Sequence, residues 1–598
     1  MLRISLKIVG AAGQGIDSIG EVVAKGLKRA GYCVFGYREF MSVIKGGHSS
    51  YQIDCSDAQV RSSEAHVNIL VCLNHHGLEI NVPDLKDGGI IVHLTPDWKF
   101  PAEMQKLLRS RKIDVIELPV EETLRKLQAK PILGNTILSA FVWAVLGQKA
   151  DALKELLREQ FGHKKDLLEL NMRCVDEGYA LHRAQKKCSV ALPTARKEWS
   201  ACMLLTGSKA MGLGAVHAGV RLYTGYPMTP SSPLLTYIAD IQNETGMVVK
   251  QAEDEITAAQ MASGAMYMGT RAMTGTSGGG FDLMSETLSM NGILENPSVF
   301  LLAQRPGPAT GLPTWTGQGD LLLAVGTAHG EFARCVLAVS DAEDYFHLMP
   351  EAFNLAEEFQ TVVIVMTDKQ IAEALFTEVP FDQSRATLRR GKLITDPKEL
   401  KKLTSGDRYD PKAKDGISPR WLPGARAATY CAQADEHNAE GSVDESAQNA
   451  AAQMEKRMKK MAALKKVLPE PELYRVISGQ RSAVSEKDEE FDILIVGWGS
   501  TKGPVLDVIE AIASEKMRIG YLHYTYLWPL KTERLAKLAA KAKKTVIIEG
   551  NFQGQLAMLL KQECGFVPTE KILKYDGRPF FLDELVDDIR RQISSSSS

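Results

Sequence analysis

The stretch GYPMTPSS, residues 225–232, constrains the fold more than any other part of the chain. Its two prolines fix the backbone φ angle and remove two N–H donors, and Thr229 and two serines place hydroxyl groups beside this rigid turn. Residues 219–224 resemble a buried strand, and residues 233–241 have the apolar spacing of a helix. A strand, a stiff turn and a helix in this order are typical of the ligand-binding edge of α/β folds. The alternative is a proline-rich turn with serine caps and no ligand.

Composition excludes several classes of protein. A chain of 598 residues predicts roughly three or four domains, and 44% hydrophobic with 24% charged residues is ordinary for a globular protein. A net charge of -2 offers no basic face for nucleic acid. No apolar run is long enough for a bilayer, and the N-terminus lacks the layout of a signal peptide, so we expect a cytoplasmic protein without membrane contact.

Strand and helix patterns alternate through most of the chain and predict an α/β fold with three doubly wound parallel-sheet domains. We place these domains at residues 1–187, 199–380 and 488–598, with a linker at 188–198. Residues 381–487 form a loop-rich connecting region, in which a capping-box pattern at 442–445 precedes a long predicted helix. The basic side chains of that helix are expected to face solvent: Lys456, Arg457, Lys459 and Lys460.

Two further motifs carry residues suited to chemistry. Arg305 follows a predicted buried strand, residues 298–303, and precedes a Pro-Gly-Pro turn; a guanidinium group binds a carboxylate through two parallel hydrogen bonds. Glu255, in the stretch QAEDE, opens a predicted helix over 256–268. The alternatives are an ordinary surface arginine and an acid that only complements the helix dipole.

Together with residues 225–232 and the stretch GTSGGG at 275–280, these motifs resemble the α subunits of the 2-oxoacid:ferredoxin oxidoreductases. The resemblance covers nearly the whole chain, in the form with a γ domain fused at the N-terminus, and is strongest to the 2-oxoglutarate-type enzymes. It implies that residues 1–187 are the γ domain, 199–380 resemble the pyrimidine-binding domain of thiamine enzymes, and 488–598 resemble the C-terminal domain of transketolase.

The resemblance also implies roles for individual residues. Glu255 would be the catalytic carboxylate that hydrogen-bonds the aminopyrimidine ring of thiamine diphosphate. Thr229 and Arg305 would bind the substrate. The cofactor site would be lined by Tyr226, Pro227, Gly278 and Gly279. We expect the glycine run to bring backbone amides to the ligand before a helix that starts at Asp282, or else to be a flexible connection capped by Asp282.

Two N-terminal motifs are weaker. The stretch KGGHSS, residues 45–50, resembles the mobile basic loop of the family, whose lysine, here Lys45, would reach the substrate or coenzyme A; a tight turn with an exposed lysine is the alternative. The glycine loop at residues 10–15 departs from the dinucleotide pattern because Ser18 stands at the last glycine position. It predicts a βα turn or a contact with coenzyme A.

The chain lacks the Gly-Asp-Gly motif that anchors thiamine diphosphate through Mg²⁺, and none of its nine cysteines stand at C-x-x-C spacing. The resemblance therefore implies a β subunit that holds thiamine diphosphate, Mg²⁺ and a 4Fe-4S cluster, in a dimer of αβ heterodimers. The implied reaction is oxidative decarboxylation of 2-oxoglutarate with coenzyme A to succinyl-CoA and CO₂, with reduction of ferredoxin. The reverse reaction is the reductive carboxylation of the reductive TCA cycle.

Three alternatives remain open at this point. The same enzyme could act on pyruvate, a branched-chain 2-oxoacid or an aryl pyruvate, because no motif reports the size of the side-chain pocket. The chain could be a non-catalytic module that binds coenzyme A or a nucleotide. It could also be a self-sufficient thiamine enzyme like transketolase, although the missing diphosphate-anchoring motif argues against this.

Overall fold

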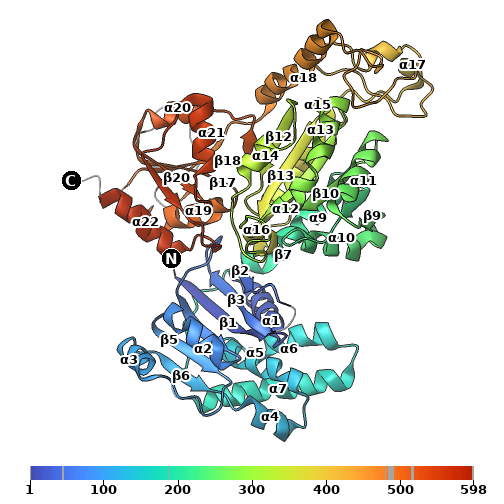
Figure 1. The fold of residues 1–598 in the computed structure, drawn as a ribbon. Helices are drawn as coiled ribbons and strands as arrows, with labels where there is room; N and C mark the ends of the chain where they lie inside the picture. Colours follow the sequence, from blue (N-terminus) through green and yellow to red (C-terminus); the bar gives the residue numbers. More distant parts are fainter. Residues whose placement is uncertain are drawn as a thin grey trace. The chain divides into compact units, whose positions relative to one another are not determined.

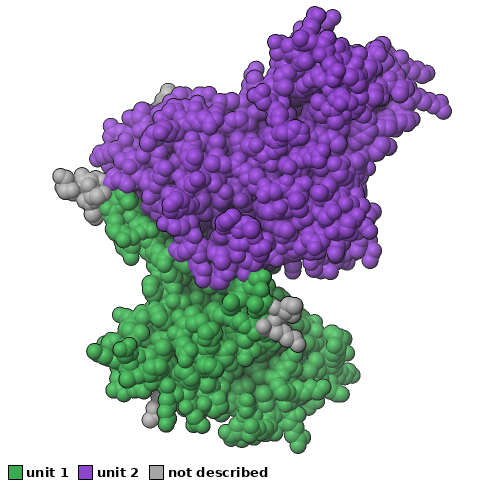
Figure 2. Space-filling model, viewed as in Figure 1, with its two compact units in different colours: residues 1–205, 374–380, 580–598 green, residues 206–373, 381–579 purple. Residues whose placement is uncertain are grey.

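The computed structural model describes residues 2–43, 46–185, 188–477, 480–481, 490–513 and 517–594. The chain forms two compact units, shown in different colours in Figure 2. Unit 1 contains residues 1–205, 374–380 and 580–598, and unit 2 contains residues 206–373 and 381–579. The described residues form an 8-stranded, a 7-stranded and a 6-stranded sheet with helices between the strands, which confirms the predicted α/β class (Figure 1).

Unit 1 is built on the 8-stranded sheet, whose strand order is β6-β5-β4-β1-β3-β2-β14-β7. Its strands are β1 (Arg3–Ala12), β2 (Cys33–Phe40), β3 (Gly46–Ser56), β4 (Val67–Cys72), β5 (Leu85–His93), β6 (Asp114–Glu117), β7 (Met203–Thr206) and β14 (Leu375–Glu378). Strands β1, β4, β5 and β6 pair in parallel, whereas β3 is antiparallel to both β1 and β2. The sheet is therefore mixed, with a doubly wound half and an antiparallel half.

The helices of unit 1 are α1 (Ile16–Arg29), α2 (His75–Asn81), α3 (Ala102–Ser110), α4 (Val120–Leu127), α5 (Gly134–Val145), α6 (Ala150–Phe161), α7 (Lys165–Ala184), α8 (Lys197–Ala201) and α22 (Leu582–Ser594). Helix α5 carries the most apolar run of the chain and is buried along nearly its whole length. The C-terminal helix α22 joins this unit because Asp583 accepts a hydrogen bond from the Ala65 N–H, 2.7 Å away.

Unit 2 contains the 7-stranded sheet, in the order β19-β12-β13-β11-β10-β8-β9. Its strands are β8 (Leu222–Gly225), β9 (Val248–Gln251), β10 (Ala272–Thr276), β11 (Ser298–Gln304), β12 (Arg334–Ala338), β13 (Val362–Asp368) and β19 (Tyr526–Trp528). Along this order, every neighbouring pair from β12 to β9 is parallel, and only β19 is antiparallel to its neighbour, β12. Because neighbouring parallel strands end on the same side, this sheet gathers the segments that follow its strands at one edge.

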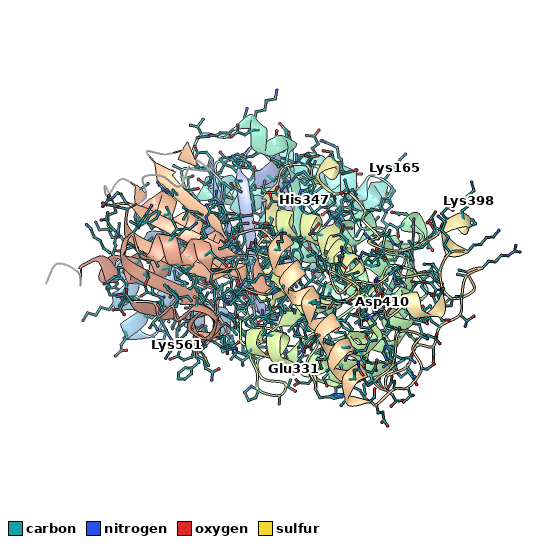
Figure 3. All side chains as sticks on the ribbon, turned by 90° about the horizontal axis from the view of Figure 1, so that it is seen from above. Lys165, Glu331, His347, Lys398, Asp410 and Lys561 are labelled. Atoms are coloured by element: carbon teal, nitrogen blue, oxygen red, sulfur yellow. The ribbon has the colours of Figure 1, made fainter. Side chains whose placement is uncertain are left out.

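The helices that accompany this sheet are α9 (Gly207–His217), α10 (Ser232–Thr245), α11 (Glu255–Tyr267), α12 (Gly278–Leu283), α13 (Ser285–Leu294), α14 (Leu321–Gly326), α15 (Ala342–Phe359), α16 (Lys369–Glu373), α17 (Pro397–Leu400) and α18 (Ala447–Val467). Lys398, on α17 in the loop-rich region, is exposed and points away from the ribbon in Figure 3.

The 6-stranded sheet of unit 2 has the order β16-β15-β18-β17-β20-β21. Its elements are β15 (Glu472–Ile477), β16 (Gln480–Arg481), β17 (Phe491–Trp498), α19 (Lys502–Ala511), β18 (Ile519–Tyr524), α20 (Glu533–Ala539), β20 (Ala542–Glu549), α21 (Gln555–Cys564) and β21 (Glu570–Leu573). Strand β19 leaves this part of the chain to pair with β12, so the two sheets of unit 2 share a connection.

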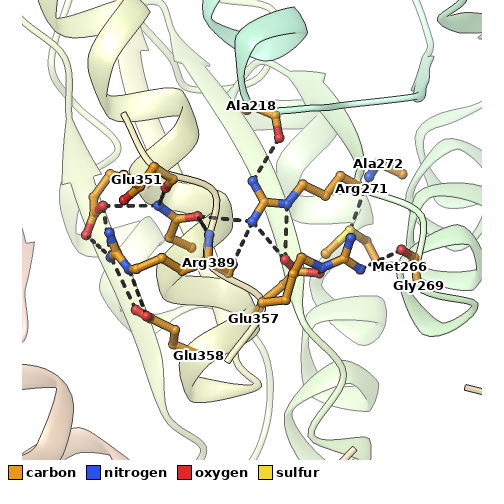
Figure 4. A network of polar contacts seen from close by, with 12 residues as sticks. Ala218, Met266, Gly269, Arg271, Ala272, Glu351, Glu357, Glu358 and Arg389 are labelled. Atoms are coloured by element: carbon orange, nitrogen blue, oxygen red, sulfur yellow. Dashed lines mark hydrogen bonds and ion pairs between the residues drawn. The ribbon is translucent and has the colours of Figure 1, made fainter. Parts of the chain in front are cut away.

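A buried ion pair fixes part of the loop-rich region onto the 7-stranded sheet (Figure 4). Arg271, just before β10, donates to the Glu357 carboxylate on α15 at 2.8 Å and to the backbone oxygen of Arg389 at 2.8 Å. The second oxygen of Glu357 pairs with Arg390 at 2.8 Å. Both Arg271 and Glu357 are almost fully buried, so their charges neutralise each other in a region that excludes water.

The long helix α18 differs from the prediction in two ways. It begins at Ala447 with Ser446 as its N-cap, not at the predicted box over 442–445. The expectation of a basic, solvated face is wrong. Of the four basic residues, Lys459 alone is exposed, whereas Lys456, Arg457 and Lys460 are buried. The physical reason is that the buried cations have acidic partners: Glu295, which ends α13, forms ion pairs with Lys456 and Lys460, and Glu436 pairs with Arg457 at 2.6 Å.

Candidate functional site

The motifs singled out in the sequence converge at the carboxyl edge of the 7-stranded sheet in unit 2. The turn at residues 226–231 follows β8, Glu255 opens the helix after β9, the glycine run follows β10, and Arg305 follows β11. These four strands are adjacent and parallel, in the order β11-β10-β8-β9. The sheet therefore brings together residues as far apart in the chain as Thr229 and Arg305, 76 positions, at the edge where α/β folds bind ligands.

Three contacts hold the turn against the ends of the neighbouring strands. The Ser231 hydroxyl donates to the backbone oxygen of Gly275 at 3.1 Å, and the Ser277 hydroxyl contacts the sulfur of Met228. The guanidinium group of Arg305 donates to the backbone oxygen of Thr229 at 2.8 Å. The two predicted substrate residues, Thr229 and Arg305, thus lie in contact.

Tyr226 and Pro227, which start the turn, are exposed; Tyr226 keeps 39% of its surface accessible. Together with Gly279, which is also exposed, they present a face of this edge to solvent. This places the predicted cofactor-lining residues where an additional molecule can reach them.

The three consecutive acids before α11 have different surroundings. Glu253 is exposed, and Asp254 is the N-cap of α11, where its carboxylate accepts the Thr257 N–H at 2.7 Å. Glu255 is only 3% exposed, and its Oε1 has no hydrogen-bond partner within the part of the chain that the structure describes. A buried carboxylate oxygen without a partner costs free energy, so this arrangement suits a ligand that supplies the missing donor.

The glycine run forms the first turn of α12, which corrects the expected helix start at Asp282. Ser277 occupies the N-cap position, and Asp282 lies inside the helix. A Cβ atom at Gly280 would lie 2.6 Å from Oε1 of Glu255, and one at Gly278 would lie 2.6 Å from Oδ2 of Asp320. The glycines therefore give two carboxylates room to approach this helix, which outweighs the poor helix propensity of glycine.

Asp320 belongs to this cluster and was missed in the sequence. It precedes the apolar run of α14 and has the appearance of an ordinary helix N-cap, but its side chain makes no capping hydrogen bond. Its Oδ2 is buried without a hydrogen-bond partner among the described residues. Burial and the nearby Asp282 raise the pKa of Asp320 to about 6, against the opposing effect of Arg305. No local signal could have revealed this, because the side chains that define its surroundings lie on other strands.

Lys45 lies outside the described residues. Val43 and Ser49, on either side of it in the chain, line a cavity of about 1150 Å³ in unit 1. The glycine loop lines the same cavity through Gly13 and Gly15, whose φ angles of 91° and 90° favour glycine. Described residues of both sequence motifs, Gly13 and Gly15 of one and Ser49 of the other, therefore border one cavity.

The described residues contain neither a cluster of metal-binding side chains nor a membrane-spanning helix. No group of three or more His, Cys, Asp or Glu side chains in these ranges is arranged to hold a metal ion. None of the described helices combines the length and the apolar character needed to cross a membrane.

Family models match three parts of the chain. "Pyruvate ferredoxin/flavodoxin oxidoreductase" matches residues 5–181, "Pyruvate flavodoxin/ferredoxin oxidoreductase, thiamine diP-bdg" matches 213–460, and "Pyruvate:ferredoxin oxidoreductase core domain II" matches 491–584. The second match contains every residue of the cluster at the carboxyl edge. The segment that matches the family's thiamine-diphosphate-binding domain thus includes this cluster.

Full-length relatives agree with these matches. The chain is 32% identical to the 2-oxoacid:ferredoxin oxidoreductase subunit alpha of Sulfolobus sp, over 98% of this chain and 96% of the relative. It is 26% identical to the 2-oxoglutarate oxidoreductase subunit KorA of Mycobacterium tuberculosis, over 92% and 84%.

A solved structure matches almost completely: the 2-oxoglutarate:ferredoxin oxidoreductase from Magnetococcus marinus with 2-oxoglutarate, coenzyme A and succinyl-CoA bound. It is 28% identical, with a TM-score of 0.89, and the match covers 99% of this chain and 100% of that chain. These matches to oxidoreductases cover nearly the whole chain, so the alternative of a non-catalytic module is set aside. The chain belongs to the 2-oxoacid:ferredoxin oxidoreductases, as an α subunit with a thiamine-diphosphate-binding domain.

Proposed function

We propose that this α subunit acts on 2-oxoglutarate, in a reaction that consumes coenzyme A, releases CO₂ and succinyl-CoA, and reduces ferredoxin. The Magnetococcus marinus enzyme, described with 2-oxoglutarate and succinyl-CoA bound, and the Mycobacterium tuberculosis subunit, named for 2-oxoglutarate, support this substrate. The Sulfolobus relative is named only for 2-oxoacids, so pyruvate or a branched-chain 2-oxoacid is the second candidate.

The observation that carries the proposal is the contact between Arg305 and Thr229 on the sheet edge that also holds Glu255. In this proposal the Arg305 guanidinium binds the carboxylate next to the oxo group through paired, charge-assisted hydrogen bonds. The Thr229 hydroxyl donates to the oxo oxygen. Glu255 faces the coenzyme from the adjacent helix, so substrate and coenzyme meet between these elements.

The residues at this edge fit the aminopyrimidine ring of thiamine diphosphate. The unpartnered Oε1 of Glu255 matches a ring nitrogen that accepts a proton, and the absence of a side chain at Gly280 leaves room beside that oxygen. When bound, thiamine diphosphate accepts the electron pair released as CO₂ leaves. Glu255 would hold the exchanging proton at Oε1, while Tyr226, Pro227, Gly278 and Gly279 would line the ring.

We assign thiamine diphosphate, Mg²⁺ and a 4Fe-4S cluster mainly to a β subunit, in a dimer of αβ heterodimers located in the cytoplasm. Two observations support a partner: the Sulfolobus relative is named an α subunit, and three of the residues proposed to line the coenzyme, Tyr226, Pro227 and Gly279, are exposed on this chain. For coenzyme A we propose the cavity in unit 1 that the glycine loop borders. Its volume of about 1150 Å³ suits a large co-substrate.

The test uses the complex reconstituted from this chain and its β subunit, with ferredoxin reduction measured for 2-oxoglutarate, pyruvate and 2-oxoisovalerate. We expect the highest kcat/KM with 2-oxoglutarate; a higher value with pyruvate would replace the proposed substrate. Arg305→Lys should lower kcat/KM for all three acids about 10- to 100-fold, because lysine cannot form the paired hydrogen bonds.

The matched control is Arg385→Lys, at an exposed arginine that pairs with Glu343 at 2.7 Å. It should leave kcat/KM within about twofold of the unchanged complex, since exposed ion pairs contribute little. If both arginine variants behave alike, the assignment of Arg305 fails.

A further inference from the structure

Asp320 occupies a helix N-cap position without acting as a cap. Asp254 and Asp341, the N-caps of α11 and α15, each accept a backbone N–H of their own helix at 2.7 and 2.8 Å. The Asp320 side chain accepts none, and its carboxylate instead lies against Gly278, where a Cβ atom would come within 2.6 Å of Oδ2. The carboxylate is therefore directed toward the candidate site and away from its own helix.

The buried Oδ2 of Asp320 has no hydrogen-bond partner among the described residues, so the environment does not satisfy an ionised carboxylate. The charged groups that act on it come from two other elements: Asp282 on α12, and Arg305 after β11. Burial, with Asp282, raises its pKa to about 6, and Arg305 opposes this rise. The neighbouring Gln304 is neutral and accepts the backbone N–H of Asp320 at 3.1 Å.

The substrate proposed above would bring a second carboxylate to Arg305. Two carboxylates near one guanidinium in a water-poor site repel each other, unless one of them takes a proton. Protonation of Asp320 removes its charge and turns its hydroxyl into a hydrogen-bond donor. The same aspartate can therefore carry its charge while the site is empty and lose that charge when the substrate arrives.

We propose that Asp320 is a positioning residue that takes up a proton from solvent when the carboxylate of a 2-oxoacid binds Arg305, and releases it when that carboxylate leaves. This inference rests on the proposed role of Arg305. It predicts that 2-oxoacid binding becomes weaker as pH rises above about 6, because the proton must then be taken from an increasingly proton-poor solution. The steepest possible fall is about tenfold per pH unit.

The experiment compares the intact complex with its Asp320→Asn variant, which has nearly the same shape as a protonated aspartate. The kcat/KM for 2-oxoglutarate is measured from pH 6 to 8.5 with saturating coenzyme A and ferredoxin. We expect the ratio of variant to unchanged complex to be near one at pH 6 and to rise with pH, by up to about tenfold per unit. A ratio that is constant across this range, or a variant weaker at every pH, would overturn the proposal.

Asp282→Asn provides a second test that leaves Asp320 in place. Asp282 is exposed, and its removal should lower the pKa of Asp320, so the decline of kcat/KM should begin at a lower pH than in the unchanged complex. An unshifted profile contradicts the inference even if Asp320→Asn does not fold. Arg305→Lys distinguishes failure of the proposed function from failure of the role of Asp320. If Arg305→Lys changes no kcat/KM value, the proposed function fails. If it lowers kcat/KM but the pH profiles of the Asp320 and Asp282 variants differ from those expected, only the role of Asp320 fails.

Discussion

Two regions of unit 2 bury carboxylates in opposite ways. At the end of α13, Glu295 is almost fully buried and forms ion pairs with the ammonium groups of Lys456 and Lys460 on α18. At the carboxyl edge of the 7-stranded sheet, Glu255 and Asp320 each have a buried oxygen with no hydrogen-bond partner, and neither forms an ion pair among the described residues. A paired charge can hold two elements together, whereas an unpaired one is costly until a ligand arrives. We infer that the first region is scaffold and the second is a site.

The charges around these groups support the contrast. Burial acts to raise the pKa of Glu295, but Lys456, Lys460 and Arg408 together hold it below the ordinary value of 4.5. For Asp320, burial prevails over Arg305, and the pKa rises to about 6. The number of cations that face each carboxylate thus decides whether the folded protein favours its ionised or its protonated form.

The largest expected effect on stability comes from Glu295→Gln. This change leaves Lys456 and Lys460 buried without their counter-charge, and should lower the free energy of unfolding by about 3–5 kcal/mol. Denaturant unfolding of the purified chain measures it. A loss below about 1 kcal/mol would show that the buried cluster does not hold α18 in place.

The same variant predicts a pH dependence. Because the pKa of Glu295 is lower in the folded chain, its ionisation stabilises the fold above pH 4.5 and this contribution disappears as pH falls below that value. The difference in unfolding free energy between the unchanged chain and Glu295→Gln should therefore shrink between about pH 4.5 and the lowered pKa. A difference that stays constant in acid would contradict the ion pairs as its source.

An intermediate effect is expected from Gly280→Ala. The added Cβ would lie 2.0 Å from the Thr276 hydroxyl oxygen and 2.6 Å from Oε1 of Glu255, so the change should cost about 1–3 kcal/mol of stability and reduce activity. Gly279→Ala is the matched control for stability, because its Cβ would have no neighbour within 4 Å. Equal stability changes in both variants would refute the close approach of Glu255.

The smallest effect is expected from Glu399→Gln, which breaks an exposed ion pair with Lys402 at 2.6 Å. Exposed pairs contribute about 0–1 kcal/mol, so unfolding should hardly change. This variant calibrates Glu295→Gln, since both remove one carboxylate charge. Comparable losses from the two would remove the contrast between buried and exposed pairs.

Local patterns predicted the elements that position the site. The strand expected at 298–303 is β11, and the helix expected at 256–268 is α11, shifted by one residue at each end. These predictions were possible because apolar periodicity and turn residues act within a few positions of one another. The meeting of Thr229 with Arg305 was expected from the family resemblance, and their contact depends on the order of the strands.

The predictions that were wrong, and the residues that were missed, depend on contacts distant in the sequence. Lys456 has the appearance of a solvated lysine until it is seen beside Glu295, 161 residues away. The glycine run at 278–280 suggested a loop because glycine disfavours helices, and only the positions of Glu255 and Asp320 explain why it opens one. No local pattern reports such pairs.

The most direct test of the account uses Glu255→Gln in the reconstituted complex, with 2-oxoacid-dependent ferredoxin reduction and the unfolding of the variant chain measured on one preparation. We predict a fall in kcat of about 10²- to 10⁴-fold, because a proton-exchanging group is lost, with a free energy of unfolding that is unchanged or higher. A kcat within about threefold of the unchanged complex, or a loss of activity accompanied by an equal loss of stability, would contradict the claim that this buried, unpaired carboxylate serves chemistry and not the fold.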